Sequence, residues 1–159
     1  MPDGSRYDED FFLWTRDQAE RLRAVGSARS DLDLDWANLA EEIESVGNSD
    51  RRELRSRLTV ILEHLLKLKY SSAERPRVGW RETIRRERHT VELVLNDSPS
   101  LQPQVATFTT AMFDEAAARV TASLAQHDET RPVGLTDKSI NMDLVDNVLS
   151  AEFFPEHVS

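Results

Sequence analysis

Glu87 is an acidic residue whose position in the sequence predicts burial. On a helical wheel of residues 80–95 it lies about 20° from the centre of the apolar face. That face is formed by Trp80, Ile84, Val91, Val94 and Leu95. A buried carboxylate is costly unless it is paired and hydrogen-bonded. The sequence therefore predicts that a basic or hydrogen-bonding side chain faces Glu87.

His64 and Arg57 are the first candidates for that partner. Both lie at the margin of the apolar face of a helix expected over residues 50–70, which a short loop joins to the helix of Glu87. Helices joined by a short loop are usually antiparallel neighbours, so a contact of either residue with Glu87 is reasonable. Glu42, at the margin of the preceding helix, is a further candidate.

The cluster of Glu42, His64 and Glu87 has three interpretations. We favour a buried polar network that fixes the register of the helices. A metal site is an alternative, since bundle cores hold carboxylate–histidine sites, but no Glu-x-x-His spacing falls on an inner face. Acid–base catalysis is the other alternative, although no nucleophile or oxyanion donor is identified. We therefore expect no cofactor, and the catalytic residues stay unknown.

Basic residues are concentrated in the middle of a chain whose net charge is −9. Between residues 67 and 88 lie Lys67, Lys69, Arg75, Arg77, Arg81, Arg85, Arg86 and Arg88, with Tyr70 and Trp80 among them. Such a segment could bind nucleic-acid phosphates. The favoured interpretation is that acidic helices of the same chain neutralise it, because the acidic protein as a whole repels a duplex.

Composition excludes several classes of protein. The chain has no cysteine, which removes disulfide scaffolds and thiolate sites, and its five glycines form no phosphate-binding loop. We expect no membrane association, because no apolar run reaches the roughly 20 residues of a spanning helix. The first residues do not resemble a signal peptide. A cytoplasmic location is the corresponding expectation.

Hydrophobic periodicity predicts helices throughout. The first has a break at the capping-box pattern of Thr15 and Gln18, and Gly47 is expected to end the second. The expected ranges are 8–25, 35–46, 50–70, 80–95, 100–126 and 142–151. We predict an all-α fold, a bundle of about five to six mostly antiparallel helices in which the third, 50–70, is the most buried. A single domain is expected over residues 1–159, with its core at about 7–155.

Three blocks of sequence resemble a known family. They are YDEDFFLWTRDQAERLR, LDLDWANLAEEIESVGNSDRRELRSRLTVILEHLLKLKY and WRETIRRERHTVELVLNDSPSL. Together they resemble the bacterial domain-of-unknown-function family twenty-nine. The resemblance implies a small helical fold and a bacterial origin but no activity, and its positions include Glu42 and His64. Leu68 departs from a tryptophan that is frequent in the family, and residues 140–142 depart from its usual C-terminal block.

The predicted function is a non-enzymatic protein-interaction or regulatory module. It rests on the lack of a complete catalytic constellation and on apolar groups near the chain ends, namely Phe11, Phe12, Phe153 and Phe154. Such groups could join two protomers, so a homodimer is expected, and an unidentified protein partner is a further option. Two alternatives stay open. One is a metal-dependent or acid–base enzyme using Glu42, His64 and Glu87, and the other is nucleic-acid binding by residues 67–88.

Overall fold

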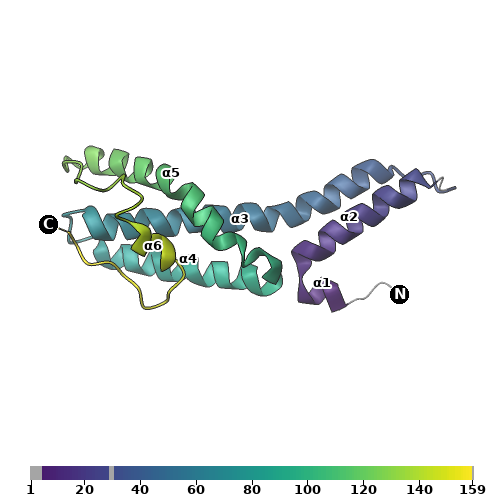
Figure 1. The fold of residues 1–159 in the computed structure, drawn as a ribbon, viewed down its shortest axis with the longest axis horizontal. Helices are drawn as coiled ribbons and strands as arrows, with labels where there is room; N and C mark the ends of the chain where they lie inside the picture. Colours follow the sequence, from purple (N-terminus) through teal and green to yellow (C-terminus); the bar gives the residue numbers. More distant parts are fainter. Residues whose placement is uncertain (1–4, 29–30, 159) are drawn as a thin grey trace. The chain divides into compact units, whose positions relative to one another are not determined.

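A computed structural model describes residues 5–28 and 31–158 of the chain. All regular structure in these residues is helical, which confirms the predicted all-α class (Figure 1). The elements are α1 (Ser5–Glu9), α2 (Phe11–Ser27), α3 (Trp36–Tyr70), α4 (Arg77–Asp97), the 3-10 helix η1 (Pro99–Leu101), α5 (Gln104–Gln126) and α6 (Met142–Asp146).

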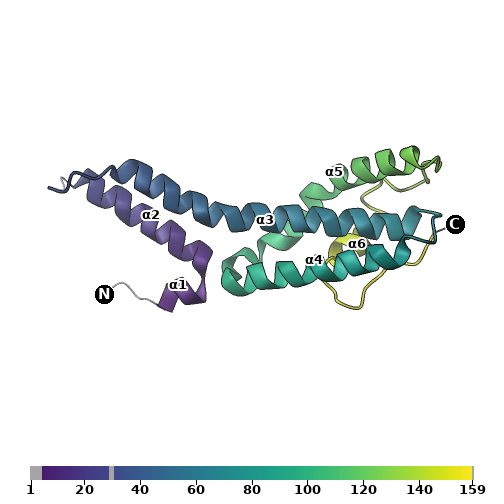
Figure 2. The ribbon, with the colours of Figure 1, turned by 180° about the vertical axis from the view of Figure 1, so that it is seen from behind.

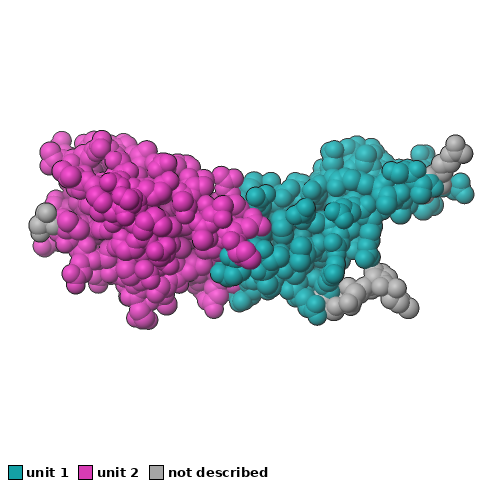
Figure 3. All heavy atoms as spheres, viewed as in Figure 1, with its two compact units in different colours: residues 1–54, 93–102 teal, residues 55–92, 103–159 magenta. Residues whose placement is uncertain are grey.

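The chain divides into two compact units, coloured separately in Figure 3. Unit 1 comprises residues 1–54 and 93–102, and unit 2 comprises residues 55–92 and 103–159. Each is described by itself below. The single domain expected over residues 1–159 stays a prediction.

Unit 1 is built on a hairpin of α2 and the first half of α3, which lie side by side in both ribbon views (Figures 1 and 2). The predicted break near the start of the chain lies at Asp10 instead of Thr15. The Asp10 carboxylate caps α2 by accepting a hydrogen bond from the N–H of Leu13, at 2.9 Å. Thr15 is buried within α2, and its hydroxyl donates to the carbonyl of Phe12 at 2.8 Å.

Gly47 does not end a helix, and the helices expected over 35–46 and 50–70 are one continuous helix, α3. The reason is a tertiary contact that a local pattern does not show. A Cβ atom at Gly47 would overlap the Thr15 hydroxyl, so this glycine allows α2 to approach α3 closely. Glycine costs a helix about 1 kcal/mol, and packing outweighs that cost here.

Unit 2 has three long helical segments. The part of α3 within it is the most buried, as predicted for the helix over 50–70, and its fully buried side chains include Leu58, Ile61, Leu62, Leu65, Leu66 and Leu68. α4 runs antiparallel to α3, because Arg57 contacts Glu87 and Arg77 donates to the carbonyl of Leu68. α5 runs parallel to α3. Arg55 of α3 lies over the Phe108 ring, and Arg119 pairs with Glu63 further along both helices.

Arg88 holds the C-terminal segment of unit 2 against α4. Its guanidinium donates to the carbonyls of Val148 (2.8 Å), Phe153 (3.1 Å), Asn147 (3.3 Å) and Ala151 (3.5 Å). It also lies over the Phe154 ring, 5.3 Å from the centroid. α6 ends at Asp146, earlier than the expected residue 151, because these carbonyls bond to Arg88 while the chain leaves the helix.

Candidate functional site

Glu87 is buried, with 4% of its surface exposed, and faces two arginines. Arg57 donates to Oε2 at 3.0 Å, and Arg86 donates to Oε1 at 3.3 Å. The contact expected between Arg57 and Glu87 is therefore present. Both carboxylate oxygens accept charge-assisted hydrogen bonds, which offset the cost of burial.

His64 is half-buried and bonded within its own helix. Its Nδ1 lies 2.8 Å from the carbonyl of Val60. Because a carbonyl only accepts, Nδ1 carries the proton. Burial lowers the pKa of His64, and the charge of Glu87 opposes this only slightly. Within the described part of the chain, no hydrogen bond joins His64 to Glu87.

Glu42 is an exposed residue of unit 1, 22 positions before His64 on α3. Across residues 5–28 and 31–158, no group of three or more His, Cys, Asp or Glu side chains is arranged to hold a metal ion. The structure thus joins Arg57 to Glu87 and does not add His64 or Glu42 to them. These contacts support a structural role for the buried pair.

Several basic residues of the segment 67–88 point into the protein. Lys69 is 8% exposed and pairs with Asp143 at 3.0 Å. Arg77 donates to the carbonyls of Leu68 and Ser71, and Arg88 donates to the carbonyls of the C-terminal segment. At Arg77 and Arg88, backbone carbonyls thus take the place of the acidic partners that the sequence predicted. The segment does not present all its charges on one continuous face.

The four phenylalanines near the chain ends, which the sequence suggested could join two protomers, are buried or half-buried. Phe12 is 5% exposed, and Phe11 is half-buried beside Tyr7, with the ring centroids 5.6 Å apart. Phe153 and Phe154 are half-buried as well, and Arg88 lies over the Phe154 ring. These four residues therefore do not provide a fully exposed apolar group.

An exposed apolar surface lies instead on one side of the α2–α3 hairpin. Val25 is 44% exposed, Leu39 41% and Val46 51%. At 100° per residue, all three lie to the same side of the line along which α2 and α3 touch. The Arg23–Glu44 ion pair marks the opposite, polar side. We call the surface of Val25, Leu39 and Val46 the apolar side of the hairpin.

The sequence alone does not reveal this surface, because the three residues follow the three- and four-residue spacing of inner helical stripes. They are the edges of those stripes. The centres are buried residues such as Ala19 and Ala40, which have no exposed surface. Small residues at the line of contact bring two helices close together, and the stripe they bury is narrow. The only local signal was the pairing of small residues on both helices.

Two exposed residues of opposite charge border the apolar side. Arg21 lies on the outer edge of α2, and Glu42 lies on the outer edge of α3. The register between α2 and α3 determines the height of each residue along the helix axes. Gly26 lies against Trp36, and Gly47 lies against Thr15, so the numbers of facing residues add to about 62. Arg21 and Glu42 therefore lie at nearly the same height on opposite borders.

Comparison with known proteins gives a family and a fold. Residues 6–154 match the family described as "Domain of unknown function DUF29". An alpha-helical protein of unknown function from Rhodospirillum rubrum, with a crystal structure at 1.45 Å resolution, shares 24% sequence identity with this chain. Its structure superposes on this one with a TM-score of 0.67. The alignment covers 94% of this chain and 98% of that one. None of the curated proteins matches this chain. Among the described helices, none is both long and apolar enough to span a bilayer.

Proposed function

We propose that this chain, which belongs to the DUF29 family, is a non-enzymatic protein-interaction module that pairs with a second copy of itself. The proposal rests on the geometry of its hairpin. The observation that carries the proposal is the apolar side of the hairpin. Three aliphatic side chains, Val25, Leu39 and Val46, are each exposed by 41% or more on one side of two helices. Exposed apolar side chains gathered on one side of a structural unit are typical of interaction sites.

A two-helix hairpin buries only the stripe where its helices touch. A second layer of helices is needed to cover a further apolar side, and two hairpins stacked face to face form a four-helix bundle. In such a bundle Val25, Leu39 and Val46 become core residues. Leu32 and Leu34, exposed by 63% and 49% beyond the end of α2, add apolar surface to the same unit.

Charge complementarity favours a second copy as the occupant. A twofold axis parallel to the helices would lay α2 of one copy over α3 of the other and keep the height of every residue unchanged. Arg21 of each copy would then meet Glu42 of the other, because the two residues have the same height on opposite borders. The symmetric pairing forms this contact twice.

The test is the mass of the full chain in solution. At about 100 µM, where a micromolar dimer is populated, analytical ultracentrifugation of the wild type should give a dimer. Leu39→Asp/Val46→Asp should give a monomer, because its charges would be buried in the bundle. Ser45→Asp is the matched control, since this exposed residue of α3 points away from the apolar side and should leave the dimer intact.

Charge reversal tests the geometry of the pairing. Arg21→Glu should weaken the dimer by placing two carboxylates together, and Arg21→Glu/Glu42→Arg should restore it. A monomeric wild type at 100 µM, or a dimer that survives Leu39→Asp/Val46→Asp, contradicts the proposal. Helical circular dichroism of every variant checks that the fold is retained.

The setting that we propose is the cytoplasm of a bacterium, and it rests on the sequence expectation alone. The enzyme and nucleic-acid interpretations gain no specific support from the contacts of Glu87, His64 and residues 67–88 described above.

A further inference from the structure

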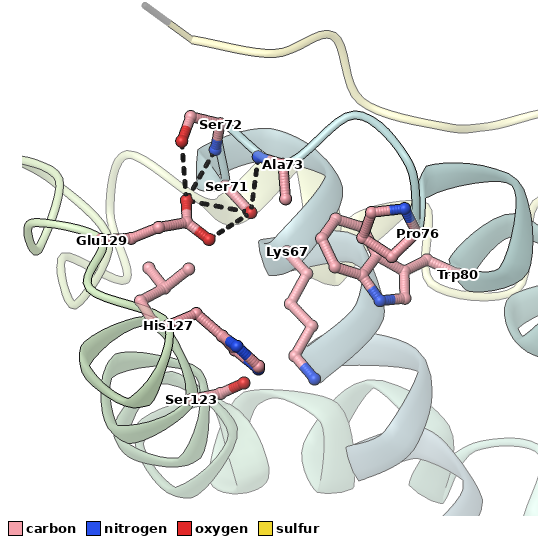
Figure 4. Close-up of a pocket in the computed structure, with 10 residues that line it drawn as sticks. Lys67, Ser71, Ser72, Ala73, Pro76, Trp80, Ser123, His127 and Glu129 are labelled. Carbon is pink, nitrogen blue, oxygen red and sulfur yellow. Dashed lines mark hydrogen bonds between the residues drawn. The ribbon is translucent and has the colours of Figure 1, made fainter.

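A pocket of about 520 Å³ opens in unit 2, far from the residues of the proposed dimer in sequence. It lies between the end of α3, the start of α4 and the end of α5 (Figure 4). Binding sites for small organic molecules have volumes of roughly 300–1,000 Å³. This pocket is therefore large enough for such a molecule.

The end of α5 shapes one wall. Asp128 adopts a left-handed conformation, with φ of 57°. The N–H of Glu129 bonds to the carbonyl of Leu124, and that of Asp128 bonds to Ala125, which is the Schellman pattern of a helix C-terminus. This turn brings Glu129 back towards the start of the loop between α3 and α4.

Both oxygens of the Glu129 carboxylate accept hydrogen bonds from that loop. It accepts hydrogen bonds from the hydroxyl of Ser71 (2.9 Å), the N–H of Ser72 (2.8 Å) and the hydroxyl of Ser72 (3.0 Å). Burial would raise the pKa of Glu129, but these hydrogen bonds outweigh burial and hold it below its usual value. Glu129 is thus a structural anion of the pocket wall.

Lys67 is a cation of the pocket that has no such partner. Its ammonium group forms no hydrogen bond or ion pair with any described residue. His127 and Ser123 extend towards the same end of the pocket (Figure 4). An ammonium, an imidazole and a hydroxyl that converge on one space can all donate hydrogen bonds to an anion.

The remaining wall is apolar and partly aromatic. Trp80 and Pro76 of the α4 side and Leu124 of α5 line it. A flat ring can lie against an indole, and aromatic contacts of this kind stabilise binding beyond the burial of area. Pockets with mainly apolar walls and a few converging polar groups are typical of ligand sites.

We propose that this pocket binds a small organic anion, with the carboxylate or phosphate of the ligand at Lys67 and His127 and its planar ring against Trp80. The site is independent of the hairpin surface and so extends beyond the proposed pairing. Specificity for the anion comes from Lys67, and preference for a flat ring comes from the indole of Trp80 in the pocket wall.

The test uses four anions with their neutral counterparts, added to the full chain. The pairs are benzoate and benzamide, phenyl phosphate and phenol, indole-3-acetate and indole-3-acetamide, and 5′-AMP and adenosine. The readout is the indole N–H signal of Trp80 in a nitrogen–proton correlation spectrum. The indole signals of Trp14 and Trp36, which belong to unit 1, are internal references.

At least one anion should shift the Trp80 signal saturably, and its neutral counterpart should bind at least about tenfold more weakly, which corresponds to 1.4 kcal/mol. Lys67→Met keeps the aliphatic stem and should lower the affinity for the anion by a similar factor. His127→Gln, at an exposed position, should weaken it less. Lys138→Met, a change of the same type outside the pocket beside Asp114, is the control and should have no effect.

Three results would overturn the proposal. They are no shift of the Trp80 signal by any of the four anions at about 10 mM, equal binding of anionic and neutral members, and binding that persists in Lys67→Met. The concentration limit corresponds to a free energy of binding of about −3 kcal/mol, weaker than a specific site of this size should give.

Discussion

The ion pair of Arg57 and Glu87 allows a quantitative test of a buried charge. Glu87 is almost fully enclosed, whereas 39% of the Arg57 side chain is exposed. Removal of one partner from a buried pair costs about 3–5 kcal/mol, because the remaining charge is uncompensated. Arg86 still contacts the carboxylate, and water reaches Arg57, so Arg57→Met should lower the free energy of unfolding by less, about 2–3 kcal/mol.

Removal of the carboxylate as well should reverse most of this loss. An apolar pair of similar volume is often as stable as a buried ion pair. Arg57→Met/Glu87→Leu should therefore be more stable than Arg57→Met alone. The double-mutant cycle should give a coupling energy of roughly 2 kcal/mol between the two positions. Urea denaturation followed by circular dichroism measures all four proteins.

Arg86→Met is the control for this cycle. Its side chain is 69% exposed, so its contact with Glu87 should contribute less than about 1 kcal/mol. The reasoning fails if Arg57→Met costs under 1 kcal/mol, or if the coupling energy is below about 0.5 kcal/mol. Either result would mean that Glu87 is compensated by something other than Arg57, and a structural role for the pair would lose its support.

Three other features allow separate tests. Arg88→Met should lower the free energy of unfolding by about 3 kcal/mol and speed hydrogen exchange in residues 147–158, because backbone carbonyls lose a buried charged donor; a loss under 1 kcal/mol contradicts this. Gly79→Ala should stabilise the protein by about 0.5–1 kcal/mol, since no described atom outside its own helical turn lies within 4 Å of the new Cβ. Gly47→Ala should destabilise it by roughly 1–3 kcal/mol, and equal effects of the two glycine changes in thermal unfolding would refute the contact with α2. Burial raises the pKa of Asp50, so its ionisation opposes folding as the pH rises above the usual aspartate pKa of about 3.9; Asp50→Asn should gain stability relative to the wild type over that rise, and a difference in melting temperature that stays constant with pH would contradict this.

The sequence was sufficient for features that depend on local periodicity. Glu87 falls on an apolar helical face, so its burial and its need for a basic partner follow from the wheel alone. Arg57 could be proposed as that partner because a short loop makes α3 and α4 antiparallel. The helical class and the high burial of the helix over residues 50–70 follow from the same periodicity.

Features that depend on distant residues could not be predicted in this way. Arg88 looks like one more charge in a basic segment, yet its acceptors lie 59 to 65 positions later in the chain. Those acceptors are backbone carbonyls, which carry no signature in the sequence. Gly47, followed by Asn48 and Ser49, has the pattern of a helix end and a new cap. The contact of Gly47 with Thr15 overrides that pattern.

The same glycine contact accounts for the surface that we propose as the dimer interface. Because Gly47 lies against Thr15 and Gly26 lies against Trp36, a side chain of one helix fills the space that the glycine of the other leaves open, and α2 and α3 approach closely. Larger residues at the edges, Val25 and Val46, are then directed past the neighbouring helix and remain about half exposed. A wider spacing would let those valines fill the gap between the helices and leave little apolar surface for a second copy. The close approach therefore couples the stability of the hairpin to its ability to pair, and Gly47→Ala should weaken both.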